Sequence, residues 1–202
     1  MRIIIIIDNN DFFLPKHIDK FLKKTKKTVI EVGIVKKVPI AASMNYFIIK
    51  NLNNFSLKEI YKLFLSKIKK IIFKFIKFEY KKKDNLSISE VLKKRKIPFF
   101  YVYYKFNEKD LLKKIKNQKI DFIISLNSLM FSKAILNSPK YSCINRHTSL
   151  LPKNKGLLPV FHSLKDNDKK FGISFHVMTA KIDNGKILVQ KEIKIKKNQS
   201  VM

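Results

Sequence analysis

An amide, an imidazole and a carboxylate lie in the second half of the chain at a spacing that suits acyl transfer. Asn145 and His147 are two positions apart in a strand-like stretch, so both side chains project to the same side. The carboxylate of Asp183 follows 36 residues after His147, and Gly185 beside it permits a close approach of the backbone. Together these groups could hold one reacting carbonyl, charge it and move a proton. Asn145, His147 and Asp183 are therefore the candidate catalytic residues.

These residues belong to a longer ordered pattern. It reads Asn145-x-His147-x-Ser149-Leu150-Leu151-Pro152-x-x-x-Gly156, then Gly172-Ile173-Ser174-Phe175-His176, then Ile182-Asp183-x-Gly185-x-Ile187-x-x-Gln190. In its order and spacing the pattern resembles the folate-dependent formyltransferases, a family that includes glycinamide ribonucleotide, methionyl-tRNA and amino-sugar formyltransferases. The resemblance is specific from about Asp121 to Gln190. Upstream of Asp121, only the order of strands and helices is similar.

The resemblance implies a reaction and a role for each candidate residue. The formyl donor would be 10-formyltetrahydrofolate, with no metal. Asn145 would hydrogen-bond the formyl oxygen, and protonated His147 would stabilise the negative charge that develops there. Asp183 would keep His147 charged and help to move the proton off the attacking amine. Elementary electrostatics supports this arrangement, because each preorganised donor aimed at a developing charge lowers a barrier by ~3 kcal/mol.

The resemblance also assigns two binding regions. The pteridine of the donor would lie between the segment Leu126 to Phe131 and the segment Met178 to Ile182, where apolar side chains suit a flat heteroaromatic ring. The loop Leu151 to Val160 would border the acceptor. The candidate cofactor-binding residues are Leu126, Leu129, Met130, Phe131, Met178, Thr179, Ala180 and Ile182. The candidate substrate-loop residues are Ser149, Leu151, Pro152, Lys153 and Gly156.

Other interpretations of the same residues stay open. His147 and Asp183 could each be structural, and with His176 they could form a metal site of two histidines and one carboxylate. His176 is expected to be a packing or hydrogen-bonding residue. The ordered pattern favours formyl transfer over both alternatives. Cys143 is the only cysteine, which excludes internal disulfides and agrees with a reducing cytoplasm.

The elements that must position these residues alternate between strand-like and helical patterns. Strand-like runs recur at residues 3–7, 29–35, 99–103, 122–126 and 142–145. Helices are expected over Pro15 to Lys24 and from Asn107 onward, and two further extended runs cover Gly172 to Thr179 and Lys186 to Ile195. This order predicts an α/β fold with a Rossmann-like, mostly parallel sheet flanked by helices, as in the formyltransferase fold.

The domain organisation is expected to be a single catalytic domain over residues 1–202, with a helical insertion at about 52–96 and a C-terminal domain absent or truncated. Capping-box patterns begin at Ser56 and Ser87. The first would open a basic amphipathic helix reaching about Tyr80, which we expect to pack on the protein rather than to lie on a membrane or nucleic acid. No apolar run reaches 18 residues without charge, so no membrane span is expected.

The acceptor is harder to predict than the donor. The formal net charge of +29 comes almost entirely from lysine, which indicates a solvated surface more than a nucleic-acid footprint. The acidic residues Asp8 and Asp11 make a poor phosphate cradle after the first strand, which argues against a glycinamide ribonucleotide acceptor. We expect a nucleotide-linked amino sugar, with Lys153 and Lys155 available to its phosphates. A methionyl-tRNA acceptor and a catalytically impaired basic binding protein remain the alternatives, and a homodimer is possible.

Overall fold

The computed structural model describes residues 1–9, 14–25, 28–36, 87–103 and 108–194, together with positions 61, 65 and 68. These residues form a seven-stranded sheet in the order β3-β2-β1-β4-β5-β6-β7. The strands are β1 (Ile3–Asp8), β2 (Val29–Val35), β3 (Phe99–Val102), β4 (Phe122–Leu126), β5 (Ser142–His147), β6 (Lys170–Val177) and β7 (Ile187–Lys194). The first five pair in parallel, and β6 and β7 are antiparallel. The predicted α/β fold with a mostly parallel sheet is confirmed.

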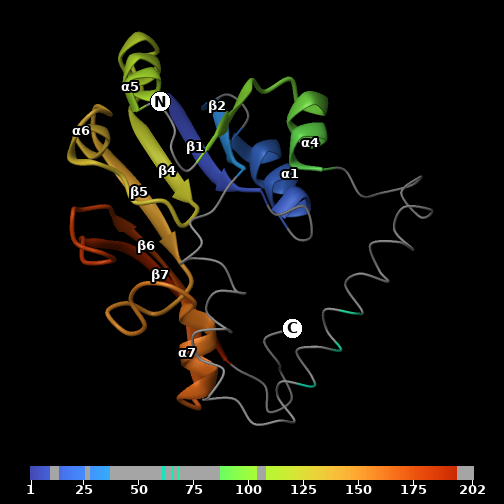
Figure 1. Cartoon of the computed structure of the whole chain (residues 1–202), viewed down its shortest axis with the longest axis vertical. Coiled ribbons are helices and arrows are strands. Elements are labelled where there is room, and N and C mark those ends of the chain that lie inside the picture. Colours follow the sequence, from blue (N-terminus) through green and yellow to red (C-terminus); the bar gives the residue numbers. More distant parts are fainter. Residues whose placement is uncertain are drawn as a thin grey trace.

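The central strand β1 is buried on both faces. It consists of five consecutive isoleucines followed by Asp8, and alternate isoleucines project to opposite faces of the sheet. Ile3, Ile5 and Ile7 belong to one core cluster, whereas Ile4 and Ile6 belong to the other. The helices α1 (Leu14–Thr25) and α4 (Ile88–Lys94) cover the first cluster, and α5 (Glu108–Asn117) and α6 (Lys133–Leu136) cover the second (Figure 1).

Local signals in the sequence explain most element boundaries. The capping box that begins α4 is present, since Ser87 Oγ accepts from the Glu90 N–H and the Glu90 carboxylate accepts from the Ser87 N–H. The predicted helix over 15–24 is α1, and the one from Asn107 is α5. The capping box at Ser56 and the basic helix lie outside the described residues, except that positions 61, 65 and 68 are helical.

Two short helices were not predicted. The helix α6 has only four residues, and α7 (Pro159–Lys165) begins inside the segment that the sequence analysis placed in a loop. Its proline lies in the first turn, where the missing N–H costs nothing. Strand β5 also continues two residues beyond its predicted end, because Arg146 and His147 pair with β6.

The carboxyl ends of the parallel strands β1, β4 and β5 meet at one edge of the sheet, where open α/β sheets bind ligands. The antiparallel strand β6 brings a second set of residues to this edge. His176 lies opposite Asn145, and Ser174 lies opposite His147. The turn between β6 and β7, which contains Asp183, therefore returns to the carboxyl end of β5.

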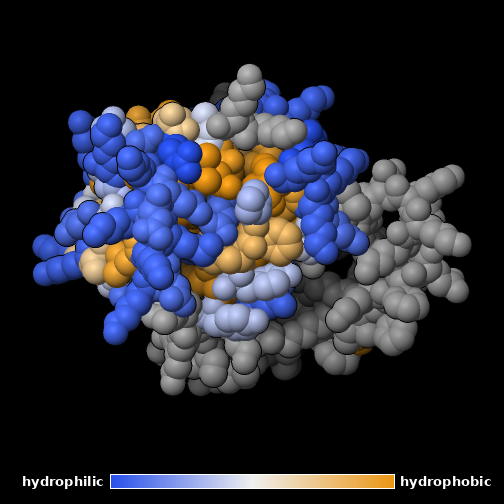
Figure 2. Space-filling view, turned by 90° about the horizontal axis from the view of Figure 1, so that it is seen from above, coloured by the Kyte–Doolittle hydropathy of each residue, from blue (hydrophilic) through white to orange (hydrophobic). Residues whose placement is uncertain are grey.

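The described surface is mostly hydrophilic when the molecule is seen from above, with an apolar area near its centre (Figure 2). This distribution agrees with lysines that are spread over a solvated surface. Of the helices in the described part of the chain, none combines the length and the apolar character that crossing a bilayer requires.

Candidate active site

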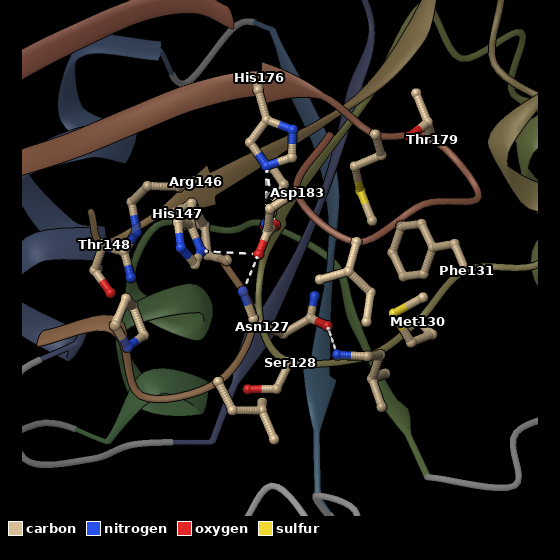
Figure 3. A pocket seen from close by; sticks show the side chains of 18 of the residues that line it. Asn127, Ser128, Met130, Phe131, Arg146, His147, Thr148, His176, Thr179 and Asp183 are labelled. Carbon is tan, nitrogen blue, oxygen red and sulfur yellow. Dashed lines mark hydrogen bonds and ion pairs between the residues drawn. The ribbon is translucent and has the colours of Figure 1, made fainter. Parts of the chain in front are cut away.

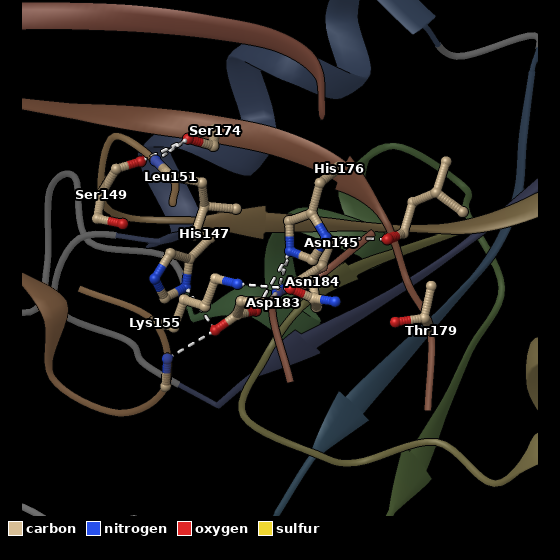
Figure 4. A network of polar contacts seen from close by, with 12 residues as sticks. Asn145, His147, Ser149, Leu151, Lys155, Ser174, His176, Thr179, Asp183 and Asn184 are labelled. Atoms are coloured by element: carbon tan, nitrogen blue, oxygen red, sulfur yellow. Dashed lines mark hydrogen bonds and ion pairs between the residues drawn. The ribbon is translucent and has the colours of Figure 1, made fainter. Parts of the chain in front are cut away.

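The Asp183 carboxylate is the centre of a polar cluster at the carboxyl end of β5 (Figure 4). Its Oδ1 atom lies 3.2 Å from His176 Nε2 and 3.4 Å from Asn145 Nδ2. Its Oδ2 atom lies 3.4 Å from His147 Nδ1 and accepts from the Gly156 N–H at 2.8 Å. Two of the predicted catalytic residues, Asn145 and His147, thus converge on the carboxylate of the third, Asp183, whose side chain is only 9% exposed.

Backbone carbonyls orient both imidazoles of this cluster. His147 Nε2 lies 2.7 Å from the Asn154 carbonyl, and His176 Nδ1 lies 2.9 Å from the Val177 carbonyl. Because a carbonyl can only accept, each of these nitrogens carries a hydrogen. The other nitrogen of each ring, His147 Nδ1 and His176 Nε2, faces Asp183. A proton on His147 Nδ1 or on His176 Nε2 therefore points at the Asp183 carboxylate.

Asn145 contributes an amide with spare hydrogen-bonding capacity. Its Nδ2 atom donates to Asp183 Oδ1 at 3.4 Å and lies 3.4 Å from His176 Nε2. Its Oδ1 atom is buried and has no hydrogen-bond partner among the described residues. Since an amide nitrogen has two hydrogens, one of them remains for a further acceptor.

The backbone of the turn after β6 holds Asp183 in place. Asp183 itself has a φ of 45°, a left-handed conformation that aspartate tolerates better than most residues. Gly185 is pressed against β6, since a Cβ atom there would lie 1.8 Å from the Val177 carbonyl oxygen. The close approach inferred from the sequence is therefore a structural requirement, and Lys155 Nζ ties the same turn to the facing loop by donating to Asn184 Oδ1 at 2.6 Å.

The pKa values of Asp183 and His176 move in opposite directions. Burial raises the pKa of the Asp183 carboxyl, but hydrogen bonds from His176 and the Gly156 N–H and the nearby imidazoles outweigh burial and leave this pKa below its ordinary value. Burial lowers the pKa of His176, but the Asp183 hydrogen bond, the Val177 carbonyl and the carboxylate charge outweigh it and raise this pKa above its ordinary value. The geometry favours an ion pair between the two groups.

The motif residues Ser149, Ser174 and Gln190 anchor the loop that follows β5. Ser174 Oγ donates to the Ser149 carbonyl at 2.6 Å and accepts from the Leu151 N–H at 3.1 Å. Gln190 Nε2 donates to Ser174 Oγ and to the Leu151 carbonyl. Ser149 Oγ in turn donates to the Lys153 carbonyl at 2.7 Å. These residues give the loop the shape that brings the Asn154 carbonyl to His147.

A cavity of about 650 Å³ opens beside the cluster and has two chemically different ends. Figure 3 shows Met130, Phe131 and Thr179 on one side of the contact between His147 and Asp183, and Arg146 and Thr148 on the other. The cavity is lined by Asp8, Leu126, Asn127, Ser128, Leu129, Met130, Phe131, Asn145, Arg146, His147, Thr148, Gly156, Leu157, Leu158, Pro159, His176, Met178, Thr179, Lys181, Ile182 and Asp183. The apolar end suits a flat aromatic ring, and the other end is polar.

The structure places most, but not all, of the candidate binding residues on this cavity. Of the cofactor-binding set, the ones that line it are Leu126, Leu129, Met130, Phe131, Met178, Thr179 and Ile182, whereas Ala180 does not. Of the substrate-loop set, Gly156 lines it, whereas Ser149, Leu151, Pro152 and Lys153 do not. Lys153 instead forms an ion pair with Asp168, so its charge is already engaged.

The expectation that His176 packs and forms hydrogen bonds is confirmed, although its contact with Asp183 and the role of Asn127 in the site were not predicted. His176 contacts Asp183 because β6 pairs with β5, and strand pairing between distant segments leaves no local signal. Asn127 Nδ2 donates to the Ile6 carbonyl at 2.9 Å, and its Oδ1 accepts from the Leu129 N–H at 2.7 Å. The turn-forming tendency of asparagine after a strand is the signal that could have indicated it. Asn127 fixes the wall segment to the end of β1.

The alternative of a metal site has no support in the described part of the chain, where no group of three His, Cys, Asp or Glu side chains could hold a metal ion. Each imidazole of the cluster already binds a backbone carbonyl through one nitrogen and faces Asp183 with the other. The thiol of Cys143 is buried, and burial raises its pKa to about 12, so it is not a nucleophile here.

Part of the sequence is similar to a family of known proteins. A family model described as Formyl transferase matches residues 69–202. The methionyl-tRNA formyltransferase of Clostridium acetobutylicum is 32% identical over 114 residues, which are 56% of this chain and 37% of that protein. The methionyl-tRNA formyltransferase of Wolbachia from Drosophila simulans is 38% identical over 88 residues, 43% of this chain and 29% of that one. The matched part of the chain thus spans 37% and 29% of the lengths of these two relatives.

Solved structures share the fold. The phosphoribosylglycinamide formyltransferase of Bacillus halodurans superposes with a TM-score of 0.65 at 16% identity, covering 99% of this chain and 83% of that one. A formyltetrahydrofolate deformylase of Pseudomonas syringae pv. tomato superposes with a TM-score of 0.60 at 12% identity, covering 99% of this chain and 53% of that one.

Substitution of Gly185 tests the close packing of the Asp183 turn. We expect Gly185→Ala to lower the rate of the chemical step by ~100-fold, because the new Cβ must push the turn off the Val177 carbonyl, and a shift of about 1 Å can cost that much. Steady-state kinetics measures the effect. Gly33→Ala is the control, because the atoms nearest to a Cβ there belong to the side chains of Phe100 and Val102 rather than to the backbone, and β2 is far from Asp183 in the sheet order. Equal rates for both variants would contradict the role assigned to the turn.

The pH behaviour of His176 tests its ion pair with Asp183. The raised pKa of His176 stabilises the fold below 6.5, and this contribution is lost as the pH rises through the raised value. The depressed pKa of Asp183 stabilises the fold above 3.8, and this contribution is lost as the pH falls through the depressed value. Between pH 3.8 and pH 6.5, both His176 and Asp183 therefore contribute fully to the stability of the fold.

We expect Asp183→Asn to lower the pKa of His176, because burial then acts without the carboxylate that opposes it. An NMR titration of the histidine rings measures the midpoint, with exposed His17 as the internal reference. A midpoint for His176 that stays unchanged or rises in the variant would refute the ion pair.

Proposed function

The chain belongs to the formyl transferase family, and we propose that it transfers a formyl group from 10-formyltetrahydrofolate to a primary amine. The observation that carries this proposal is the convergence of Asn145, His147 and Asp183 beside a cavity with an apolar and a polar end. The bound donor supplies an activated formyl carbon next to a good leaving nitrogen. The residues of this chain would bind it, orient it and move the proton.

The apolar end of the cavity fits the flat ring system of the donor. Leu129 and Phe131 are almost fully buried there, whereas Met130 and Ile182 are exposed at the mouth. Asn127 holds the wall rigid through its bond to the end of β1. A preformed apolar slot of this kind binds a heteroaromatic ligand without an ordering cost.

The polar cluster would stabilise the charge that develops on the formyl oxygen. The second Nδ2 hydrogen of Asn145 is one donor, and a proton on His147 Nδ1 is the other. Asp183 cannot drift away from either group, because Gly156 and the turn with Gly185 fix its position. Donors that are already in position stabilise the developing charge without having to move first. A rigidly held Asp183 carboxylate, which positions both donors, therefore suits the reaction.

Asp183 and His147 would also receive the proton of the attacking amine. The amine must lose one proton as its nitrogen bonds to the formyl carbon, and the leaving nitrogen of the donor must gain one. The Asp183 carboxylate can accept the proton of the amine, and protonated His147 can donate one to the leaving nitrogen. The two groups are in contact, so both transfers take place at one point. The chain therefore needs no covalent intermediate with Ser149, whose Oγ donates to the Lys153 carbonyl.

For the acceptor we propose the aminoacyl group of methionyl-tRNA. The curated relatives are methionyl-tRNA formyltransferases, although the chain spans only about a third of their length. The net charge of +29 indicates a solvated surface more than a nucleic-acid footprint, but it also supplies a long-range attraction for a polyanionic partner. The amino-sugar acceptor favoured by the sequence has no counterpart in these relatives, and the engaged Lys153 weakens the phosphate site suggested for it.

The donor assignment is tested with folate and a single substitution. The wild-type chain is expected to bind a 10-formyltetrahydrofolate analogue in a calorimetric titration. His147→Ala is expected to keep that binding and to lower formyl transfer by ~10²–10³-fold, since a donor to the developing charge is lost. A wild-type chain that binds no folate analogue would instead support the alternative of a basic binding protein.

The acceptor assignment is tested by formyl-transfer assays with charged initiator tRNA and with nucleoside-diphosphate-linked amino sugars, at physiological salt. We expect turnover with the tRNA. The salt matters because attraction between bare charges weakens steeply as salt rises, and only specific binding then survives. Turnover with the amino sugars alone would overturn the tRNA proposal and leave the donor chemistry intact.

A further inference from the structure

Two charged side chains that line the cavity, those of Asp8 and Arg146, each have a buried atom that is left without a partner in the part of the chain that the structure describes. Within the described residues, neither Asp8 Oδ1 nor Arg146 Nε has a hydrogen-bond partner, and both atoms are buried. Such orphaned atoms are rare in folded proteins, because each forfeits a hydrogen bond that water would have made. Neither residue belongs to the cluster around Asp183.

Arg146 lies on the side of the cavity away from the wall assigned to the donor, and Asp8 is near enough to interact with its charge. Asp8 ends β1, and Arg146 lies on β5 between the catalytic candidates Asn145 and His147. Both line the cavity. Figure 3 places Arg146 on the side of His147 that lies away from Met130 and Phe131, which form part of the apolar wall. A ligand held here is adjacent to the reacting centre and opposite the end assigned to the donor.

The charges of the pair restrict what can bind. Burial raises the pKa of Asp8, while hydrogen bonds from Ser128 and the charge of Arg146 oppose that rise. Burial lowers the pKa of Arg146, and the charge of Asp8 opposes that fall. Burial leaves the pKa of Asp8 above its ordinary value and the pKa of Arg146 below it, while the charge of each side chain favours the ionised form of the other. A phosphate would be repelled by Asp8, and an ammonium group would be repelled by Arg146.

A neutral hydroxyl satisfies both orphaned atoms, because it can donate to a carboxylate oxygen and accept from a guanidinium N–H. We propose that Asp8 and Arg146 form a subsite for a sugar-ring hydroxyl of the acceptor, close to its reactive amine. This inference rests on the proposed formyl transfer. The hydroxyl chemistry is shared by the terminal ribose of an aminoacyl-tRNA, whose free hydroxyl neighbours the aminoacyl ester, and by the ring of an amino sugar.

The test measures acceptor binding to the full chain with pairs of probes that differ by one hydroxyl. The ribose pair is 3′-methionylamino-3′-deoxyadenosine and its 2′-deoxy counterpart. The hexose pair is a UDP-linked 4-amino-4-deoxyglucose and its 3-deoxy counterpart. In calorimetric titrations, we expect wild type to bind the hydroxylated member of one pair ~10-fold more tightly, because deletion leaves two charged groups unpaired. The pair that shows the difference identifies the source of the hydroxyl.

The variants Asp8→Asn and Arg146→Gln should each weaken binding of the hydroxylated probe ~10-fold, and neither should weaken binding of the deoxy probe. Binding of the folate analogue should stay unchanged. The matched controls remove the same charges away from the cavity: Asp110→Asn on an exposed position of α5, and Arg95→Gln at the half-buried C-cap of α4, where the substitution also removes the ion pair with Asp19. Arg146→Lys guards against a merely structural effect, since it keeps the charge but not the Nε–H, and it should bind like Arg146→Gln.

The subsite is overturned if wild type does not distinguish the members of either pair, or if the two variants lose affinity for both members equally. A wild type that binds neither probe overturns it as well. Failure of the formyl-transfer proposal is seen separately, as loss of folate-analogue binding by the wild-type chain. Binding of folate without discrimination between probes would therefore refute this subsite alone.

Discussion

One carboxylate determines the geometry of the whole site. Asp183 receives an imidazole and a backbone N–H on one oxygen, and an imidazole and an amide on the other. In a nearly dry environment each of these contacts is stronger than it would be in water, and the loss of any one would leave a buried polar group without a partner. The positions of the two histidines, the amide and the loop with Gly156 are thus coupled to a single charge.

That charge is held where the parallel part of the sheet meets its antiparallel part. Parallel strands bring Asn145 and His147 to the carboxyl edge of the sheet, whereas the antiparallel strands β6 and β7 bring back the turn with Asp183. Ser174 and Gln190 join the two halves by bonding the loop after β5. The motif residues that do not touch the cavity therefore serve the ones that do, because they fix the backbone around them.

The cavity beside this cluster separates two tasks. Its apolar wall suits the ring system of a folate, and its lining also includes the charged side chains of Asp8 and Arg146, each with a buried atom that has no partner among the described residues. A transferase needs such a division, because two substrates must meet at one point while each is recognised by different chemistry. The position of His147 and Asp183 between the two ends fits the transfer of a small group across that point.

The sequence alone determined the reaction class and the sheet, because both depend on local patterns. Five isoleucines in a row require a strand buried on both faces, and the spacing of Asn145, His147 and Asp183 carries the resemblance to formyltransferases. Tertiary structure decided the rest. Only the pairing of β5 with β6 puts His176 against Asp183, and only the meeting of β1 with β5 across β4 puts Asp8 near Arg146. Contacts between distant segments depend on how the whole chain packs, and no local spacing encodes them.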